Sequence, residues 1–186
     1  MKRAVLFLFL FTAIGIFVGT QFLSVRRNLV SQRALIEAQW AELSDAFEQR
    51  AELVAHFTDV VKQGSNSQDR VFTDEANAQS AFAQALAPQA KIEANSQLMN
   101  AFARLYVVAE AHPKLTSSES YRRLNEEIGY AEGSVAIERR KYNDLLEHYN
   151  AQLQRFPSNV VAAMTGLQRI DAYVRTEQEA DRKSVV

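Results

Sequence analysis

The sequence contains no cysteine, which excludes disulfide bonds and thiolate metal sites but does not indicate a compartment. It has three prolines and six glycines in 186 residues, and two of these glycines, Gly15 and Gly19, lie in an apolar N-terminal stretch. Helix-breaking residues are therefore scarce, which favours a few long helices over many short strands. The formal net charge of −1 lacks the basic excess that is typical of nucleic-acid-binding proteins.

An apolar stretch of 20 residues without a charge extends from Ala4 to Leu23. At about 1.5 Å per residue, a helix of this length crosses a hydrocarbon layer of about 30 Å. We therefore predict a transmembrane anchor over residues 1–24, a bundle domain over residues 25–175 and a polar tail over residues 176–186. A cleaved signal peptide is the competing interpretation, although the apolar run exceeds the usual ~7–15 residues and no Ala-x-Ala pattern follows it.

The charges beside this stretch do not predict its orientation. Lys2 and Arg3 precede it, and Arg26, Arg27 and Arg33 follow it, so the positive-inside rule gives no clear answer. The three arginines stop the membrane segment or, on a cytoplasmic side, contact anionic headgroups. We expect a single-pass protein of the cell membrane, with the side of the soluble domain left open.

Apolar residues at helical spacing predict three long helices and a short fourth. The first covers Val25 to Gln63, and the second covers Gln68 to Ala111 with a break at Pro88. The third runs from Ser117 to Arg155 and the last from Asn159 to Tyr173. The expected fold is all-α: an N-terminal transmembrane helix that continues into an up-down bundle of three long antiparallel helices, with a short C-terminal helix.

Apolar residues mark the core-facing positions of the helices, at steps of alternately four and three residues in the first and third. In the first they are Leu29, Arg33, Ile36, Trp40, Leu43, Phe47, Arg50, Val54, Phe57 and Val61. In the second they are Phe72, Phe82, Leu86, Ile92, Met99, Phe102, Tyr106 and Ala109. In the third they are Tyr121, Leu124, Ile128, Ala131, Val135, Glu138, Tyr142, Leu145, Tyr149, Gln152 and Phe156. In the last helix Val160, Met164, Leu167 and Ile170 form a stripe that we expect to pack in the core, with a partner face as the alternative.

Serine and threonine residues at capping positions predict where helices begin. Ser65 with Gln68, and the segment Thr116 to Glu119, have the spacing of a capping box. Ser158 is placed to cap the last helix. The tail from Arg175 to Lys183 is almost wholly polar, and we expect it to fray.

The charged residues Arg50 and Glu138 interrupt core faces that are mostly apolar. An unpaired buried charge is costly. We therefore expect Arg50 to form an ion pair with an acidic residue of the third helix, either Glu132 or Glu138.

Several motifs are distributed along the chain. They are Glu37-Ala-Gln-Trp40 with Phe47, Arg50, Leu53 and Val60-Val-Lys62, then Glu110-Ala-His-Pro113-Lys-Leu115, then the run from Glu132 to Asn143, followed by Tyr149-Asn150 and Phe156-Pro157-Ser158. Together these motifs resemble those of the LemA family. Gln49 and Ala55-His56 depart from the family pattern locally. The resemblance covers nearly the whole chain and implies a bundle of long helices on one membrane anchor.

The candidate interaction or structural residues come from these motifs. They are Trp40, Arg50, Glu132, Arg139, Tyr142, Asn143, Tyr149, Asn150, Phe156 and Pro157. The Tyr-Asn pairs either pack the core while their polar atoms satisfy nearby backbone, or form a patch that grips a partner.

The sequence offers little for catalysis. Glu52/His56 and Asp144/His148 are four residues apart, as metal ligands can be, but the Glu-x-x-His pairs of di-metal bundles are absent, so we interpret them as surface pairs. No G-x-S-x-G motif and no glycine-rich phosphate loop occurs. We predict no catalytic, cofactor-binding or metal site.

The anchor and the rigid helices together favour a membrane-anchored scaffold or adaptor. We expect it to bind other membrane or envelope proteins, or copies of itself, and not nucleic acid. The alternative is a hydrolase or metal-dependent enzyme with a site between helices, and a third interpretation is a lipid-binding bundle.

Overall fold

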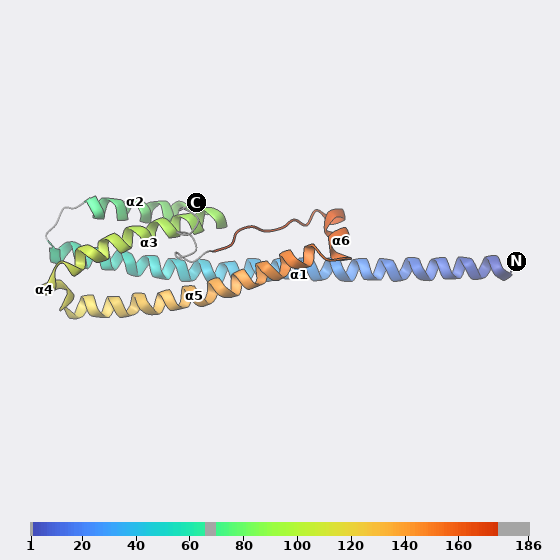
Figure 1. Ribbon diagram of the computed structural model, residues 1–186, viewed down its shortest axis with the longest axis horizontal. Helices are drawn as coiled ribbons and strands as arrows, with labels where there is room; N and C mark the ends of the chain where they lie inside the picture. Colours follow the sequence, from blue (N-terminus) through green and yellow to red (C-terminus); the bar gives the residue numbers. More distant parts are fainter. Residues whose placement is uncertain (1, 66–69, 175–186) are drawn as a thin grey trace, which may run out of the picture. The chain divides into compact units, whose positions relative to one another are not determined.

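A computed structural model describes residues 2–65 and 70–174, and every regular element in that part of the chain is an α-helix (Figure 1). The helices are α1 (Lys2–Ser65), α2 (Arg70–Gln84), α3 (Pro88–Glu110), α4 (Pro113–Thr116), α5 (Glu119–Leu153) and α6 (Ser158–Thr165). The predicted all-α fold, with long helices and a short C-terminal one, is confirmed. The predicted capping pair Ser65/Gln68 and the tail from Arg175 to Lys183 lie wholly or partly outside the described residues.

The described chain divides into two compact units, to both of which α1 and α5 contribute. We call residues 39–142 with 172–174 the four-helix unit after its four longer helical segments, which are α2, α3 and parts of α1 and α5. The short α4 lies in the same unit, between α3 and α5 in the sequence. We call residues 2–38 with 143–171 the anchor unit, which contains the remainder of α1 and α5 together with α6.

Helix α1 runs without interruption from the apolar stretch into the core-forming segment, as expected. No proline occurs in it, and no glycine lies between Gly19 and Gly64, so nothing in this interval weakens the helical backbone. Its N-terminal part is long and apolar enough to cross a membrane, and none of that stretch is buried against other described residues. The apolar stretch therefore finds no protein core within the described chain.

The core of the four-helix unit is built on the predicted face of α1. Phe57 is fully buried, and its ring centroid lies 5.2 Å from that of Phe102 in α3 and 5.3 Å from that of Tyr121 in α5. Tyr106 of α3 stacks on the same ring at 6.0 Å. Five of the predicted apolar positions of α1 are buried in this unit: Leu43, Phe47, Val54, Phe57 and Val61. Leu29 and Ile36, which belong to the anchor unit, are also buried. One aromatic cluster thus joins three helices.

The second helical region is divided as predicted, since α2 ends at Gln84 and α3 begins at Pro88. Proline suits the first helical position because its missing N–H has no intrahelical acceptor there. Leu86, predicted to face the core, is instead exposed. It lies in the connection before Pro88, where the chain is not helical and the helical period no longer applies.

Two predicted capping residues are wrong. The hydroxyl oxygen of Ser118 accepts a hydrogen bond from the backbone N–H of Tyr121 and so caps α5. Thr116 instead belongs to α4 and donates to the carbonyl of Pro113. Ser158 lies inside α6 and makes no side-chain cap there.

The last helix is shorter than predicted. It ends at Thr165 and not at Tyr173, because Gly166 adopts a left-handed conformation with φ of 71° and terminates it. The buried face of α6 consists of Ser158, Val161 and Ala162. Val160 and Met164, which we expected to pack in the core, are exposed, and so is Phe156 in the turn that precedes α6.

Candidate functional site

The first Tyr-Asn pair contributes to the core of the four-helix unit through its tyrosine. Tyr142 is 2% exposed, and its ring lies 5.5 Å from the half-buried ring of Trp40. Trp40 in turn meets Phe47 edge-on at 6.5 Å. Burial raises the pKa of the Tyr142 hydroxyl to about 12, so this side chain remains neutral at physiological pH. Trp40 and Tyr142 therefore join α1 to α5 by aromatic packing.

The second Tyr-Asn pair holds the segment that follows α6, within the anchor unit. The side-chain amide of Asn150 donates to the carbonyl of Ile170 at 2.8 Å and accepts from the N–H of the same residue at 3.0 Å. The hydroxyl of the buried Tyr149 donates to the carbonyl of Gln168 at 3.3 Å. These bonds satisfy backbone groups of a non-helical segment, which is the structural role weighed for the pair. We call Tyr149, Asn150 and residues 168–170 the C-terminal clamp.

The other motif residues are not gathered into one site. Glu132 is exposed, and Arg139 and Asn143 are half-buried. Phe156 and Pro157 are both exposed in the turn between α5 and α6. The motif residues therefore divide into three groups: residues of the core, residues of the C-terminal clamp and residues at the surface.

The expected ion pair between Arg50 and the third helix is not formed. The guanidinium of Arg50, buried in the four-helix unit, donates to Oδ1 of Asn95 in α3 at 2.7 Å and lies 5.9 Å from the centre of the Phe47 ring. The carboxylate of Glu138 instead accepts from Lys141 at 2.8 Å and from Gln39 at 2.6 Å. These bonds, that to Lys141 above all, lower the pKa of Glu138.

A second buried cation, Lys91, was missed by the sequence reasoning. Its ammonium group lies 4.0 Å from the centre of the Phe82 ring and 3.1 Å from a carboxylate oxygen of Glu48. It also donates to the carbonyl of Phe82 at 3.5 Å. Lys91 thus joins α1, α2 and α3, with its charge on an aromatic face and its partner Glu48 at the surface.

A buried carboxylate, Glu75 of α2, was also missed. Burial raises the pKa of this side chain, repulsion from Asp59 adds to the effect, and a hydrogen bond with Thr58 opposes it in part. Glu75 lies three residues after Phe72 and seven before Phe82, so it shares the core face of α2. The spacing from Phe72 and Phe82 could have predicted from the sequence that Glu75 is buried.

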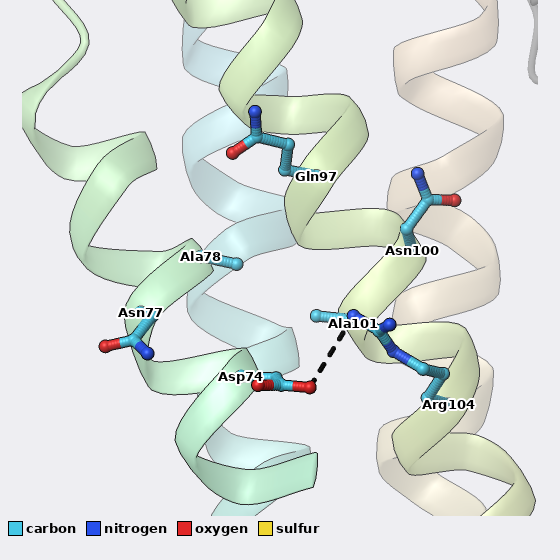
Figure 2. A pocket seen from close by; sticks show the side chains of 7 residues that line it. All are labelled: Asp74, Asn77, Ala78, Gln97, Asn100, Ala101 and Arg104. Atoms are coloured by element: carbon cyan, nitrogen blue, oxygen red, sulfur yellow. Dashed lines mark ion pairs between the residues drawn. The ribbon is translucent and has the colours of Figure 1, made fainter. Parts of the chain in front are cut away.

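A polar groove lies between α2 and α3 in the four-helix unit (Figure 2). It has a volume of about 480 Å³ and is lined mainly by Asp74, Asn77, Gln97, Asn100 and Arg104. Asp74 and Arg104 face each other across it at 4.0 Å, and both are more than half exposed. An exposed ion pair at this distance contributes little to the stability of the fold. The side chains that line the groove include no His or Cys.

The histidine pairs lie at the surface. Glu52, His56, Asp144 and His148 are all exposed. Among residues 2–65 and 70–174, no three His, Cys, Asp or Glu side chains approach closely enough to hold a metal ion.

The geometry defines a class of protein, namely a helical bundle whose first helix also carries an apolar stretch suited to a membrane. A family model described as the LemA family matches residues 39–186. The chain belongs to the LemA family.

Two proteins of Paramagnetospirillum magneticum (strain AMB-1), named magnetosome protein MamQ 1 and MamQ 2, are each 28% identical to this chain over 85 residues. Magnetosome protein MamQ of Magnetospirillum gryphiswaldense (strain MSR-1) is 25% identical over 87 residues. These matches cover 46–47% of this chain and 31–32% of the relatives. The similarity therefore spans about a third of the length of these relatives.

The C-terminal clamp generates a first prediction, because Asn150 alone provides two bonds to Ile170. We expect Asn150→Ala to accelerate amide hydrogen exchange at Ile170 roughly tenfold, since a net hydrogen bond contributes about 1–1.5 kcal/mol. The control is Glu147→Ala, an exposed change in the same helix. Unchanged exchange at Ile170 in Asn150→Ala would contradict the clamp.

The buried carboxyl of Glu75 generates a second prediction. Its folded-state pKa is raised, so the stability it contributes is complete below the unfolded pKa of about 4.3 and is lost as pH rises through the folded value. We expect Glu75→Gln to melt at a higher temperature than the unmodified protein at pH 8, with the difference vanishing near pH 4.

Thermal unfolding followed by circular dichroism from pH 4 to 8 measures this effect. The exposed change Glu52→Gln on α1 is the control. A difference in melting temperature that does not vary with pH would show that the ionisation of Glu75 does not act as described.

Proposed function

We propose that this protein is a membrane-tethered adaptor that crosses the membrane once and binds another membrane or envelope protein through an exposed face of α5. The tether is the apolar part of α1, which is long enough to span a bilayer and is not buried in the described protein. Because the same helix continues into the four-helix unit, the anchor needs no separate linker to carry the bundle.

The observation that carries the proposal is an apolar face on α5, opposite the buried side of that helix. Tyr130 is 79% exposed and Ile137 is 57% exposed, and they lie seven residues apart. Gly133 and Ser134 lie between them at three and four residues from Tyr130, so all four share one side of the helix. We call Tyr130, Gly133, Ser134 and Ile137 the α5 face.

Glycine in the middle of α5 destabilises the helix, and packing among the described residues does not compensate for this loss of stability. A glycine inside a helix is less favourable than alanine by roughly 1 kcal/mol. Among residues 2–65 and 70–174, a Cβ atom added at Gly129 or Gly133 would meet nothing within 4 Å, so packing within that part of the chain does not require either residue to be glycine. A partner helix that approaches the α5 backbone closely would account for both, since small residues permit such contact.

The comparisons support a role without catalysis. The family match covers the four-helix unit, and the MamQ relatives are named for the magnetosome and not for a reaction. An aromatic residue and an aliphatic one beside small residues are also typical of the anchor positions in protein interfaces.

The test is site-specific photo-crosslinking in native membranes. Photoreactive residues replace Tyr130 and Ile137 on the α5 face, and Asn125, which is exposed on the flank of the same helix, is the control site. We expect one discrete heterologous protein to be captured from Tyr130 and Ile137 and not from Asn125. Only self-adducts, or no adducts at all, would contradict an adaptor for other proteins.

The same test is sharpened by Gly133→Ala. This change should raise the free energy of unfolding by about 0.5–1 kcal/mol, since alanine favours the helix and there is room for its Cβ. It should nevertheless lower the crosslinking yield from Tyr130. Asn125→Ala, which also raises helix propensity, should leave that yield unchanged.

A further inference from the structure

We propose that α6 and the turn before it form a second membrane contact, which rests on the surface of the bilayer beside the transmembrane part of α1. Phe156, Val160 and Met164 would insert among the lipid headgroups. This inference depends on the anchor of the proposed function, but it does not depend on the α5 face.

The position of this segment within the anchor unit is the first observation that supports a membrane contact. The side-chain amide of Gln152 donates to Oδ1 of Asn28 at 3.1 Å, and Phe156 and Ser158 line a groove together with Asn28. Figure 1 shows α6 beyond the end of α5, beside α1. Asn28 follows Leu23, where the apolar stretch Ala4 to Leu23 ends, by five residues, which is about 8 Å of helix. The polar layer of a bilayer is roughly 5–7 Å thick on each side, so α6 lies at the depth where that layer ends.

The composition of α6 is the second observation that supports a membrane contact. Its inner face is buried through Val161 and Ala162, yet its outer face is apolar as well, with Val160 47% and Met164 72% exposed. Phe156 in the preceding turn is 83% exposed. A surface helix in water normally presents polar residues outward. An apolar outer face at the outer edge of the polar layer suits contact with the bilayer surface, because interfacial helices bury their apolar face by about 5–10 Å, which is enough to cross that layer.

The charged residues around this surface are the third observation that supports a membrane contact. No Asp or Glu occurs before Glu37 or between residues 148 and 170. Arg26, Arg27 and Arg155 are exposed, and no ion pair is found for them among the described residues. The membrane-proximal end of the anchor unit therefore presents cationic side chains and no anionic ones, which complements anionic headgroups.

The experiment measures the depth of single spin labels on the full chain in lipid nanodiscs. Because the chain has no cysteine, each introduced cysteine is unique. Met164→Cys probes the proposed contact, Ile14→Cys probes the anchor, and the exposed Asp144→Cys on α5 is the control within the same unit. Collision with oxygen reports lipid exposure, and collision with a water-soluble nickel chelate reports water exposure.

We expect the label at Met164 to be richer in oxygen and poorer in nickel contact than the label at Asp144. We also expect it to lie deeper in discs that contain anionic phosphatidylglycerol than in discs of phosphatidylcholine alone. Arg155→Glu should remove that dependence on lipid charge, while Arg122→Glu, an exposed change in the four-helix unit, should preserve it.

Two results separate the failure of this inference from failure of the anchor. If the label at Ile14 is in lipid while that at Met164 matches Asp144, the second contact is wrong and the anchor stands. If the label at Ile14 is itself in water, the anchor fails and the second contact fails with it. Low collision with both reagents at Met164, accompanied by spin–spin broadening, would overturn the proposal in favour of a second copy of this chain on α6.

Discussion

Helix α1 carries two different kinds of surface on one uninterrupted backbone. Its N-terminal part is apolar on all sides and unburied, as a segment in contact with lipid must be, while its C-terminal part is apolar on one side only and packs there against α3 and α5. No proline occurs in the helix, and no glycine lies between Gly19 and Gly64. The apolar stretch and the core-forming face therefore belong to one continuous helix.

Buried polar groups add specificity to a core that apolar packing builds. Arg50 reaches Asn95, and Lys91 reaches Glu48 and the Phe82 ring, so both cations connect α1 to α3 at defined positions. Asn150 does the same for a segment without regular structure, because its amide matches the N–H and the carbonyl of Ile170. Each such contact adds little to the free energy of folding. It disfavours other ways of aligning the helices, because any other alignment would leave a buried polar group unpaired.

The spacing of apolar residues was sufficient to predict the long helices and most of the core, because a bundle buries one face of each helix with a fixed period. It failed where that period ends: Leu86 and Phe156 both adjoin proline-containing turns and are exposed. The last helix was extended too far because Gly166 terminates it. The partner of Arg50 was wrong because spacing along one helix does not show which residue of another lies within reach. Glu75 and Lys91 were missed because charged residues are seldom buried.

Amide hydrogen exchange along residues 24–42, measured on the full chain in lipid nanodiscs, tests the continuity of α1 most directly. The account predicts slow exchange at every amide from Ser24 to Glu42, because each N–H in this interval is bonded within one helix. A run of rapidly exchanging amides anywhere in the interval would show that the helix is broken. The apolar stretch and the bundle would then be separate parts joined by a linker, which would contradict the central claim.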